Sequence, residues 1–192
     1  MQRTAGFVLV GGRSSRMGTE KARLKVGTEF LVETVARKVA EAAGTVTLVG
    51  NPEAFLDLPF ACVPDTRPGL GPIAGLEAAL ATGQAELNLV TGCDMPDLRA
   101  SDLTRLLAEA ESNPALCTLA RDRRDCSHPL CAVYRREALP AVRAALDAGR
   151  LRLLALVEEL RAVEVRIDSV LSNLNTPEQW AAWQAEQPVR GI

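Results

Sequence analysis

The fold is decided by one stretch near the start of the chain, GFVLVGGRSSRMGTEK, which runs from Gly6 to Lys21. Its first part is an apolar run with the character of a β-strand. The rest is a loop with three glycines, two serines, two arginines and a lysine. Glycines let backbone N–H groups approach a phosphate closely, and the cationic side chains neutralise its charge. Because open α/β sheets bind ligands at the carboxyl ends of their strands, the stretch predicts a phosphate site after the first strand.

The glycine spacing fits neither of two common phosphate-binding motifs. G-x-G-x-x-G fails because position 13 is Arg, and G-x-x-x-x-G-K-[ST] fails because no glycine stands five residues before a Gly-Lys pair. An ordinary glycine-rich turn is the competing interpretation, and it is weakened by two carboxylates that follow later strands.

The composition is that of an ordinary globular protein. The 192 residues are 47% hydrophobic with a net charge of −2, so we expect neither a nucleic-acid nor a membrane partner. The first strand is too short for a signal peptide and no apolar run reaches spanning length, which makes the cytoplasm the expected location. The five cysteines form no C-x-x-C pair, and an odd count suits a reduced compartment. Since His128 is the only histidine, we expect no zinc site.

Strand-like and helix-like segments alternate along the chain, and such repeated βα units predict a mostly parallel, twisted sheet with helices on both faces. Gly44 ends the first helix, Pro72 and Gly83 bracket the second, and Thr176 caps the last. We expect a single domain over residues 1–186 and a flexible tail over residues 187–192. The expected strands are Thr4–Val10, Thr45–Val49, Phe60–Val63, Leu87–Thr91, Leu116–Ala120, Leu130–Tyr134 and Ala162–Ile167. The expected helices are Phe30–Ala43, Pro72–Ala81, Ser101–Glu111, Glu137–Ala148, Leu151–Leu160 and one that begins at Thr176.

Two carboxylates follow strands at the sheet edge where the glycine-rich loop is expected. Asp94 ends an apolar strand and is followed by Met95 and Pro96. A hard oxygen ligand beside phosphates is what Mg²⁺ requires, whereas the alternative is an Asp that forms a turn before Pro96. Asp65 begins a second Gly/Pro-rich loop between a strand and a helix. Each alone is more readily explained as a turn residue, but three such loops at successive strand ends favour a ligand site.

The same residues resemble a known family. Leu9–Lys21 resembles the L-x-G-G-x-S-x-R-M-G-x-D-K signature of nucleotidyltransferases that act on sugars and on pterin cofactors, with Glu20 in place of Asp. Pro64–Leu76 is similar to their second loop, and Cys93–Pro96 to their metal-site turn. Within that group the chain most resembles the molybdenum cofactor guanylyltransferases, from about residue 5 to residue 184. The discriminating pieces are the Cys-Asp-x-Pro turn, His128-Pro129 before a strand, and Asn173-Leu174-Asn175-Thr176-Pro177-Glu178.

The resemblance implies a three-layer, Rossmann-like α/β nucleotidyltransferase fold and an Mg²⁺-dependent enzyme. The implied reaction joins GTP to molybdenum-bound molybdopterin and yields the guanine dinucleotide cofactor and pyrophosphate. The implied catalytic residues are Lys21, Arg16 and Asp94, with Mg²⁺ on Asp94. The implied GTP-binding residues are Leu9, Val10, Gly11, Gly12, Lys21, Asn51, Asp65 and Asp94. A phosphate monoester is already largely ionised, so such an attacking group needs no Ser–His or Cys–His system.

For the molybdopterin substrate, the residues implied are His128, Asn173 and Asn175. Asn173 and Asn175 are equally well explained as turn residues before a capped helix, and His128 as a hydrogen-bonded core residue. The charged runs Arg121–Asp125 and Arg135–Glu137 are interpreted as solvated surface, with a basic patch for an anionic substrate as the alternative.

Other functions fit the same motifs. A cytidylyltransferase for the same cofactor, or a sugar-phosphate nucleotidyltransferase, is the alternative enzyme, because base choice rests on few backbone contacts. A regulatory nucleotide-binding domain without turnover is the non-enzymatic alternative, and the presence of both Lys21 and Asp94 argues against it. We expect a monomer that makes transient contacts with proteins of cofactor synthesis or molybdoenzyme maturation.

Overall fold

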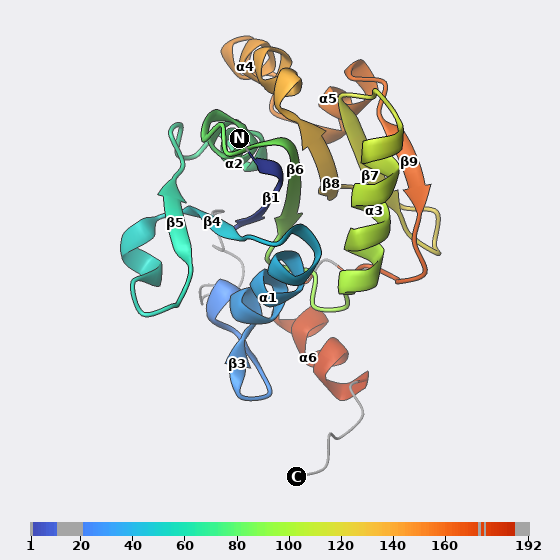
Figure 1. The fold of residues 1–192 in the computed structure, drawn as a ribbon. Coiled ribbons are helices and arrows are strands. Elements are labelled where there is room, and N and C mark those ends of the chain that lie inside the picture. The colour runs from blue at the N-terminus through green and yellow to red at the C-terminus, as the bar shows by residue number, and fades with distance from the viewer. Residues whose placement is uncertain (1, 11–20, 173, 175, 187–192) are drawn as a thin grey trace.

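The computed structural model describes residues 2–10, 21–172, 174 and 176–186 of the chain (Figure 1). Its centre is a seven-stranded sheet in the order β5-β4-β1-β6-β8-β7-β9. The strands of this sheet are β1 (Gln2–Leu9), β4 (Thr47–Gly50), β5 (Ala61–Pro64), β6 (Ala85–Gly92), β7 (Cys117–Arg121), β8 (Ser127–Arg135) and β9 (Val163–Arg166).

The sheet is mostly parallel, as the alternation of strands and helices predicts. Strands β5, β4, β1 and β6 run parallel to one another, and β9 runs parallel to β7. Strand β8 is antiparallel to both of its neighbours, β6 and β7. In β1, Leu9 pairs with Val49 on one side and Gly92 on the other. Strands β1, β4 and β6 therefore end at one edge of the sheet, which is where ligands bind in such folds.

Helices cover both faces of the sheet, which gives the expected three layers (Figure 1). Because side chains alternate along a strand, Val8 and Leu48 face one layer while Phe7 and Val49 face the other. Both sets are buried, which explains why β1 is a continuous apolar run. The first layer holds α1 (Leu31–Ala43) and α3 (Ala100–Ser112), and the second holds α2 (Pro72–Ala81), α4 (Leu139–Asp147) and α5 (Leu153–Glu159).

The predicted helix ends are found at the residues that signal them. Gly44 ends α1 with a φ of 78°, a left-handed conformation that suits glycine. Helix α2 begins at Pro72, which needs no N–H partner there. Before α6 (Pro177–Glu186), Thr176 and Gln179 exchange backbone-to-side-chain hydrogen bonds of 3.1 and 3.3 Å. This is the predicted capping box.

Several short elements were not expected from the sequence. A 3₁₀ turn, η1 (Lys21–Arg23), leads into a hairpin of two-residue strands, β2 (Lys25–Val26) and β3 (Glu29–Phe30). The prediction that Phe30 belongs to the first helix was wrong, because its backbone pairs with Lys25 across the hairpin. The guanidinium of Arg23 lies 5.4 Å from the centre of the Phe30 ring, at the distance of a cation–π contact. Two further 3₁₀ helices are η2 (Pro52–Phe55) and η3 (Arg136–Ala138).

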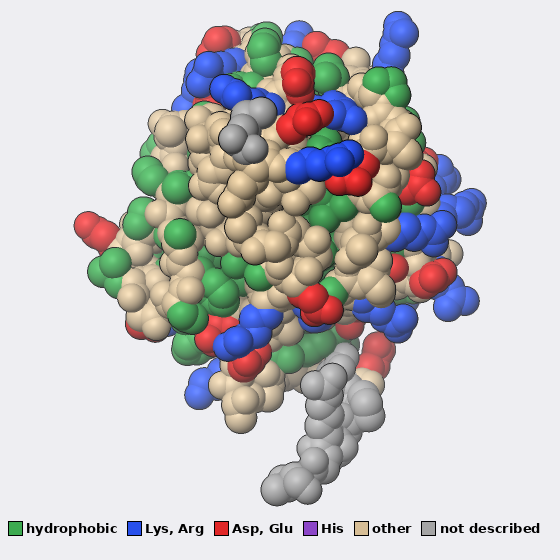
Figure 2. All heavy atoms as spheres, in the orientation of Figure 1, with side chains coloured by type: hydrophobic (Ala, Val, Ile, Leu, Met, Phe, Trp, Pro, Cys, Tyr) green, Lys and Arg blue, Asp and Glu red, His purple; other side chains and the backbone are tan. Residues whose placement is uncertain are grey.

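None of the helices in the described part of the chain is long and apolar enough to cross a membrane. Lys and Arg side chains are interspersed with Asp and Glu over the face shown in Figure 2, as the small net charge suggests. The tail predicted over residues 187–192 lies outside the described residues.

Candidate active site

The glycine-rich loop begins and ends at buried residues of the core. Val10 is buried at the end of β1, and Ala22 is buried in η1, where the described chain resumes. The Val10 N–H donates to the carbonyl of Val49, and the Leu9 carbonyl accepts from the Cys93 N–H at 3.2 Å. These backbone groups extend the sheet toward the loop. That Leu9 and Val10 contact the base of the nucleotide stays a prediction. Such a contact would use backbone groups other than the Val10 N–H and the Leu9 carbonyl, which are already hydrogen-bonded within the protein. The predicted residues Gly11, Gly12, Arg16, Asn173 and Asn175 and the side chain of Lys21 lie outside the described residues.

Asp94 stands two residues beyond β6, half-buried at the same edge of the sheet. Its carboxylate folds back over Gly92, so that a Cβ atom added to Gly92 would lie 2.7 Å from Asp94 Oδ1. Real Cβ atoms do not approach that closely, so glycine is required for this position of the carboxylate. Gly92 was not among the predicted site residues, although the sequence places it two positions before Asp94.

A single carboxylate fits one kind of metal site. In the described part of the chain, no group of three or more His, Cys, Asp or Glu side chains is placed to hold a metal ion. Mg²⁺ is commonly bound through one or two carboxylates together with substrate phosphates and water. Asp94 therefore suits a metal that arrives with its nucleotide.

Asp65 and Asn51 both make local hydrogen bonds at the ends of their strands. Asp65 Oδ1 accepts from the Arg67 N–H at 2.9 Å and closes a turn after β5. Asn51 Oδ1 accepts from the Glu53 N–H at 3.1 Å and caps η2. Both contacts account for these residue types without a ligand. A role in nucleotide binding therefore remains a prediction for each of them.

A pocket of about 430 Å³ brings Asp94 and His128 together. His128 comes from the start of β8, next to Ser127, which also lines the pocket. Arg152, before α5, supplies a guanidinium, and the described residues form no ion pair with it. Ser127 and Arg152 were not predicted from the sequence. The apolar part of the wall consists of Pro72, Met95, Pro129, Leu130, Leu151, Leu153 and Leu154.

His128 is a buried residue held beside a buried carboxylate. Its Nε2 atom lies 3.2 Å from Asp122 Oδ2, an ion-pair distance, but the N–H direction departs from that of a good hydrogen bond. Asp122 also accepts N–H groups from Arg124 and Cys126 at Oδ1 and from Leu171 at Oδ2. Burial alone would raise the pKa of Asp122, but these N–H groups and His128 outweigh it and lower the pKa below the ordinary 3.8.

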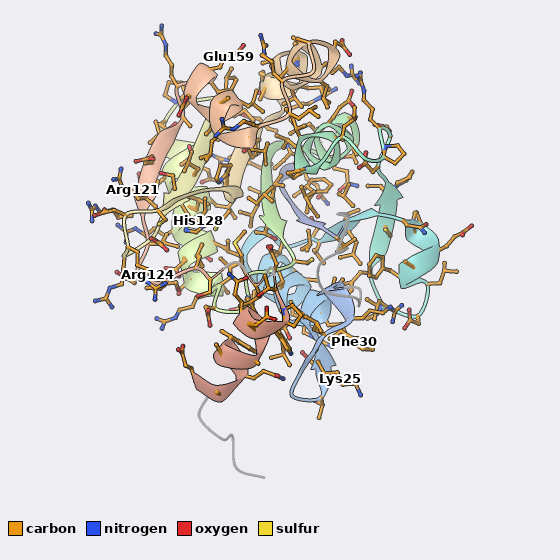
Figure 3. The ribbon with its side chains drawn as sticks, turned by 180° about the vertical axis from the view of Figure 1, so that it is seen from behind. Lys25, Phe30, Arg121, Arg124, His128 and Glu159 are labelled. Carbon is orange, nitrogen blue, oxygen red and sulfur yellow. The ribbon has the colours of Figure 1, made fainter. Side chains whose placement is uncertain are left out.

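The charged run at the end of β7 is an ion-pair network on the surface. Arg121 contacts Glu164 at 2.6 Å and Asp125 at 3.3 Å, and Arg166 contacts Asp125 at 2.9 Å. In Figure 3, Arg121 and Arg124 lie at the periphery, whereas His128 lies further inside. The interpretation as solvated surface suits these pairs, because exposed arginines that are paired with carboxylates supply little net positive charge.

The fold and the match to a family model together define the chain as a nucleotidyltransferase of the three-layer α/β type. A family model described as "MobA-like NTP transferase domain" matches residues 6–167, and the chain belongs to that family. A relative from Mycobacterium tuberculosis named "Probable molybdenum cofactor guanylyltransferase" is 35% identical over 181 residues, which is 90% of this chain and 89% of the relative.

Solved structures agree with this assignment. The structure of molybdopterin-guanine dinucleotide biosynthesis protein A from Archaeoglobus fulgidus superposes with a TM-score of 0.75 at 26% identity, covering 93% of this chain and 95% of that one. A manganese complex of a second Mycobacterium tuberculosis protein superposes with a TM-score of 0.76 at 18% identity, covering 97% of this chain and 100% of that one. At that identity the second likeness shows the fold alone.

Proposed function

We propose that the protein transfers GMP from GTP to the molybdopterin cofactor and releases pyrophosphate. An oxygen of the acceptor's phosphate would attack the α-phosphorus of GTP, and the bond from that phosphorus to the bridging oxygen of pyrophosphate would break. The observation that carries the proposal is the position of Asp94, which lies at the nucleotide edge of the sheet and also lines an apolar pocket. A donor and an acceptor could therefore meet at one carboxylate. The names of full-length relatives agree with this reaction.

On the donor side, the glycine-rich loop would hold the phosphates of GTP. The N–H groups of Gly11 and Gly12 would donate to phosphate oxygens, while Arg16 and Lys21 would neutralise the charge that develops on pyrophosphate. Leu9, Val10, Asn51 and Asp65 would contact the nucleoside. The resemblance to the family supports these roles.

Asp94 would bind Mg²⁺ together with the phosphates of GTP. The bound ion would neutralise phosphate charge and favour departure of pyrophosphate. The chemistry of a carboxylate among phosphates supports a divalent cation, because Mg²⁺ is commonly bound through one or two carboxylates together with substrate phosphates. The chain's own part is to hold the Asp94 carboxylate in place over Gly92.

On the acceptor side, the pocket wall suits a flat, polar ring system with an anionic tail. Pro129, Leu130 and Leu153 offer apolar surface, and His128 would hydrogen-bond a ring edge. Arg152 would bind an anionic group of the acceptor. Asn173 and Asn175 would add amide groups, as the family resemblance suggests. An acceptor phosphate needs no general base, because most of it is doubly ionised near neutral pH.

We further propose a cytoplasmic monomer that meets other proteins of cofactor synthesis or molybdoenzyme maturation only transiently. The net charge of −2 gives no electrostatic reason to expect a membrane or nucleic-acid partner, which favours the cytoplasmic location. Light scattering of the purified protein over a range of concentrations would test whether it is a monomer.

The decisive experiment measures pyrophosphate release with each of the four nucleoside triphosphates in the presence of molybdopterin cofactor. Release with GTP alone is the expected result, since a site that hydrogen-bonds one base edge leaves its polar groups unpaired with another base. Comparable release with CTP would favour the cytidylyltransferase, and release only with a sugar phosphate as acceptor would favour the sugar enzyme. Binding of GTP without any release would favour the regulatory domain.

A further inference from the structure

Glu77 is a buried carboxylate on a helix that is otherwise apolar. Helix α2 reads PIAGLEAALA, and Glu77 is its only charged residue. The residue is 4% exposed. Burying a carboxylate costs free energy of folding unless charged partners and hydrogen bonds compensate for the lost hydration. The contacts of Glu77 therefore indicate what its burial serves.

Two of those contacts come from the loop that carries Asp65. The guanidinium Nε of Arg67 lies 3.0 Å from Glu77 Oε2, and the Thr66 hydroxyl lies 3.4 Å from the same oxygen. Thr66 and Arg67 directly follow Asp65, whose carboxylate accepts the N–H of Arg67. The backbone and the side chain of Arg67 thus join the Asp65 turn to the second turn of α2.

The remaining contacts tie this pair to α4. Glu77 Oε1 lies 3.0 Å from Arg143 Nε, and Arg67 Nη1 lies 2.6 Å from Asp147 Oδ1. Arg143 and Asp147 are both half or more exposed, whereas the Glu77 side chain is 6% exposed. The buried carboxylate is therefore the centre of the network, and the exposed residues complete it.

We propose that Glu77 is a positioning residue for the nucleotide-binding loop: through Thr66 and Arg67 it fixes the loop from Asp65 to Pro72 against α2. The proposal rests on the proposed function, because it takes the Asp65 loop to contact GTP. Pro72, at the end of that loop, also lines the pocket beside Asp94. One anchored loop would therefore set the position of both Asp65 and part of the pocket wall.

A graded series of variants at Glu77 separates positioning from packing. Glu77→Gln keeps the shape and part of the hydrogen bonding but removes the charge. Glu77→Leu removes both while filling the site with apolar atoms. We expect affinity for a fluorescent GTP analogue to fall in the order wild type, Gln, Leu, with a loss of about tenfold or more for Leu, because small misplacements of binding groups are costly. Thermal stability should not follow that order, since an apolar residue can replace a buried ion pair without loss.

The matched control is Glu86→Gln, which removes another carboxylate paired with an arginine, Arg135, at 2.8 Å. Its GTP affinity should equal that of the wild type. If Glu77→Leu fails to fold, Arg67→Ala tests the positioning role instead. We expect this variant to fold, because Arg67 is one-third exposed and its loss leaves Glu77 paired with Arg143. Arg67→Ala should weaken GTP binding and speed amide exchange in residues 66–70.

The outcomes separate this proposal from the proposed function. Wild-type protein that binds no GTP would overturn the function itself. Wild-type protein that binds GTP, with a folded Glu77→Leu or Arg67→Ala variant that binds it equally well, would overturn the positioning role alone.

Discussion

The backbone N–H of Leu174 donates a hydrogen bond of 3.1 Å to the carbonyl oxygen of Asp94. Leu174 is 3% exposed, so the bond is shielded from water. Two hydrogen bonds fix the chain that leads to Leu174. The Ile167 N–H donates to the Arg121 carbonyl, and the Leu171 N–H donates to the Asp122 carboxylate. Leu174 is thus attached to the turn that carries the predicted metal ligand.

Replacement of Asp94 by Asn should weaken metal-supported GTP binding, because a neutral amide is a poorer ligand for a hard dication. Isothermal titration of GTP with and without Mg²⁺ measures the effect. Asp97→Asn is the control, since Asp97 lies in the same turn but accepts the indole N–H of Trp183 at 2.8 Å. Unchanged metal dependence in Asp94→Asn would remove this residue from the metal site.

Gly92→Ala should abolish most activity by displacing the Asp94 carboxylate, which lies 2.7 Å from the added Cβ. The fold should survive, because the short contact is to a side chain at the edge of the sheet. Gly44→Ala is the matched control. It places Ala at a φ of 78° in open space, so it should lose about 1 kcal/mol or more of stability and keep its activity. Normal turnover by Gly92→Ala would mean that Asp94 tolerates displacement.

The parts of this fold that could be predicted from the sequence are those with local signals. Helix α2 was predicted at its observed bounds, because Pro72 fixes the first turn and Gly83 follows the end. The position of Asp94 after a strand followed from an apolar run that ends in an acidic residue. The hairpin of β2 and β3 was missed because strands of two residues leave no periodicity, and because its contacts with the core, among them Val26 and Phe30, come from residues distant in the sequence.

The pocket could not be predicted in full, because it depends on which strands become neighbours. Strand β8 inserts antiparallel between β6 and β7, which brings Ser127 and His128 beside Asp94. Arg152 arrives from a separate turn before α5. His128 was selected because its motif resembles a family's, whereas nothing local marks Arg152 as different from other charged residues. Glu77 is the single charged residue of an apolar helix, but its partners come from a separate loop and from α4, which the local sequence does not show.

Lys21→Ala should lower turnover by about a hundredfold or more while leaving the fold intact, since the proposed role of the lysine is to stabilise charge on phosphates. Circular dichroism and a guanylyl-transfer assay measure the two effects. Lys25→Ala, in the neighbouring hairpin, is a suitable control for the loss of a nearby lysine charge. A folded Lys21→Ala protein with near-normal transfer would contradict the assignment.

Arg152→Gln should raise the KM for the molybdopterin substrate and leave the KM for GTP unchanged, because Arg152 lines the proposed acceptor pocket. Arg150→Gln is the control on the same turn, since Arg150 is exposed and contacts Glu159 at 3.4 Å. Initial rates with each substrate varied in turn give both constants. A change in the KM for GTP alone would assign the pocket to the donor.

Asp122→Asn should destabilise the protein in a pH-dependent way. The lowered pKa of Asp122 means that its carboxylate adds stability above its unfolded pKa of about 3.8, and that this contribution is lost as the pH falls through the folded pKa. At neutral pH the variant should lose about 1–3 kcal/mol, because its amide cannot accept the N–H groups of Arg124, Cys126 and Leu171 together. The difference from the wild type should shrink as the pH falls below about 4.

Chemical denaturation of both proteins at a series of pH values measures this difference directly. The Glu164 carboxylate, whose pKa is lowered by the Ser127 hydroxyl and by Arg121, is present in both proteins and cancels in the comparison. Asp125→Asn is the control, because its carboxylate is more than half exposed and its ion pairs contribute little. A constant difference between wild type and Asp122→Asn across the acid range would show that shape, and not the charge of Asp122, holds His128 and Leu171 in place.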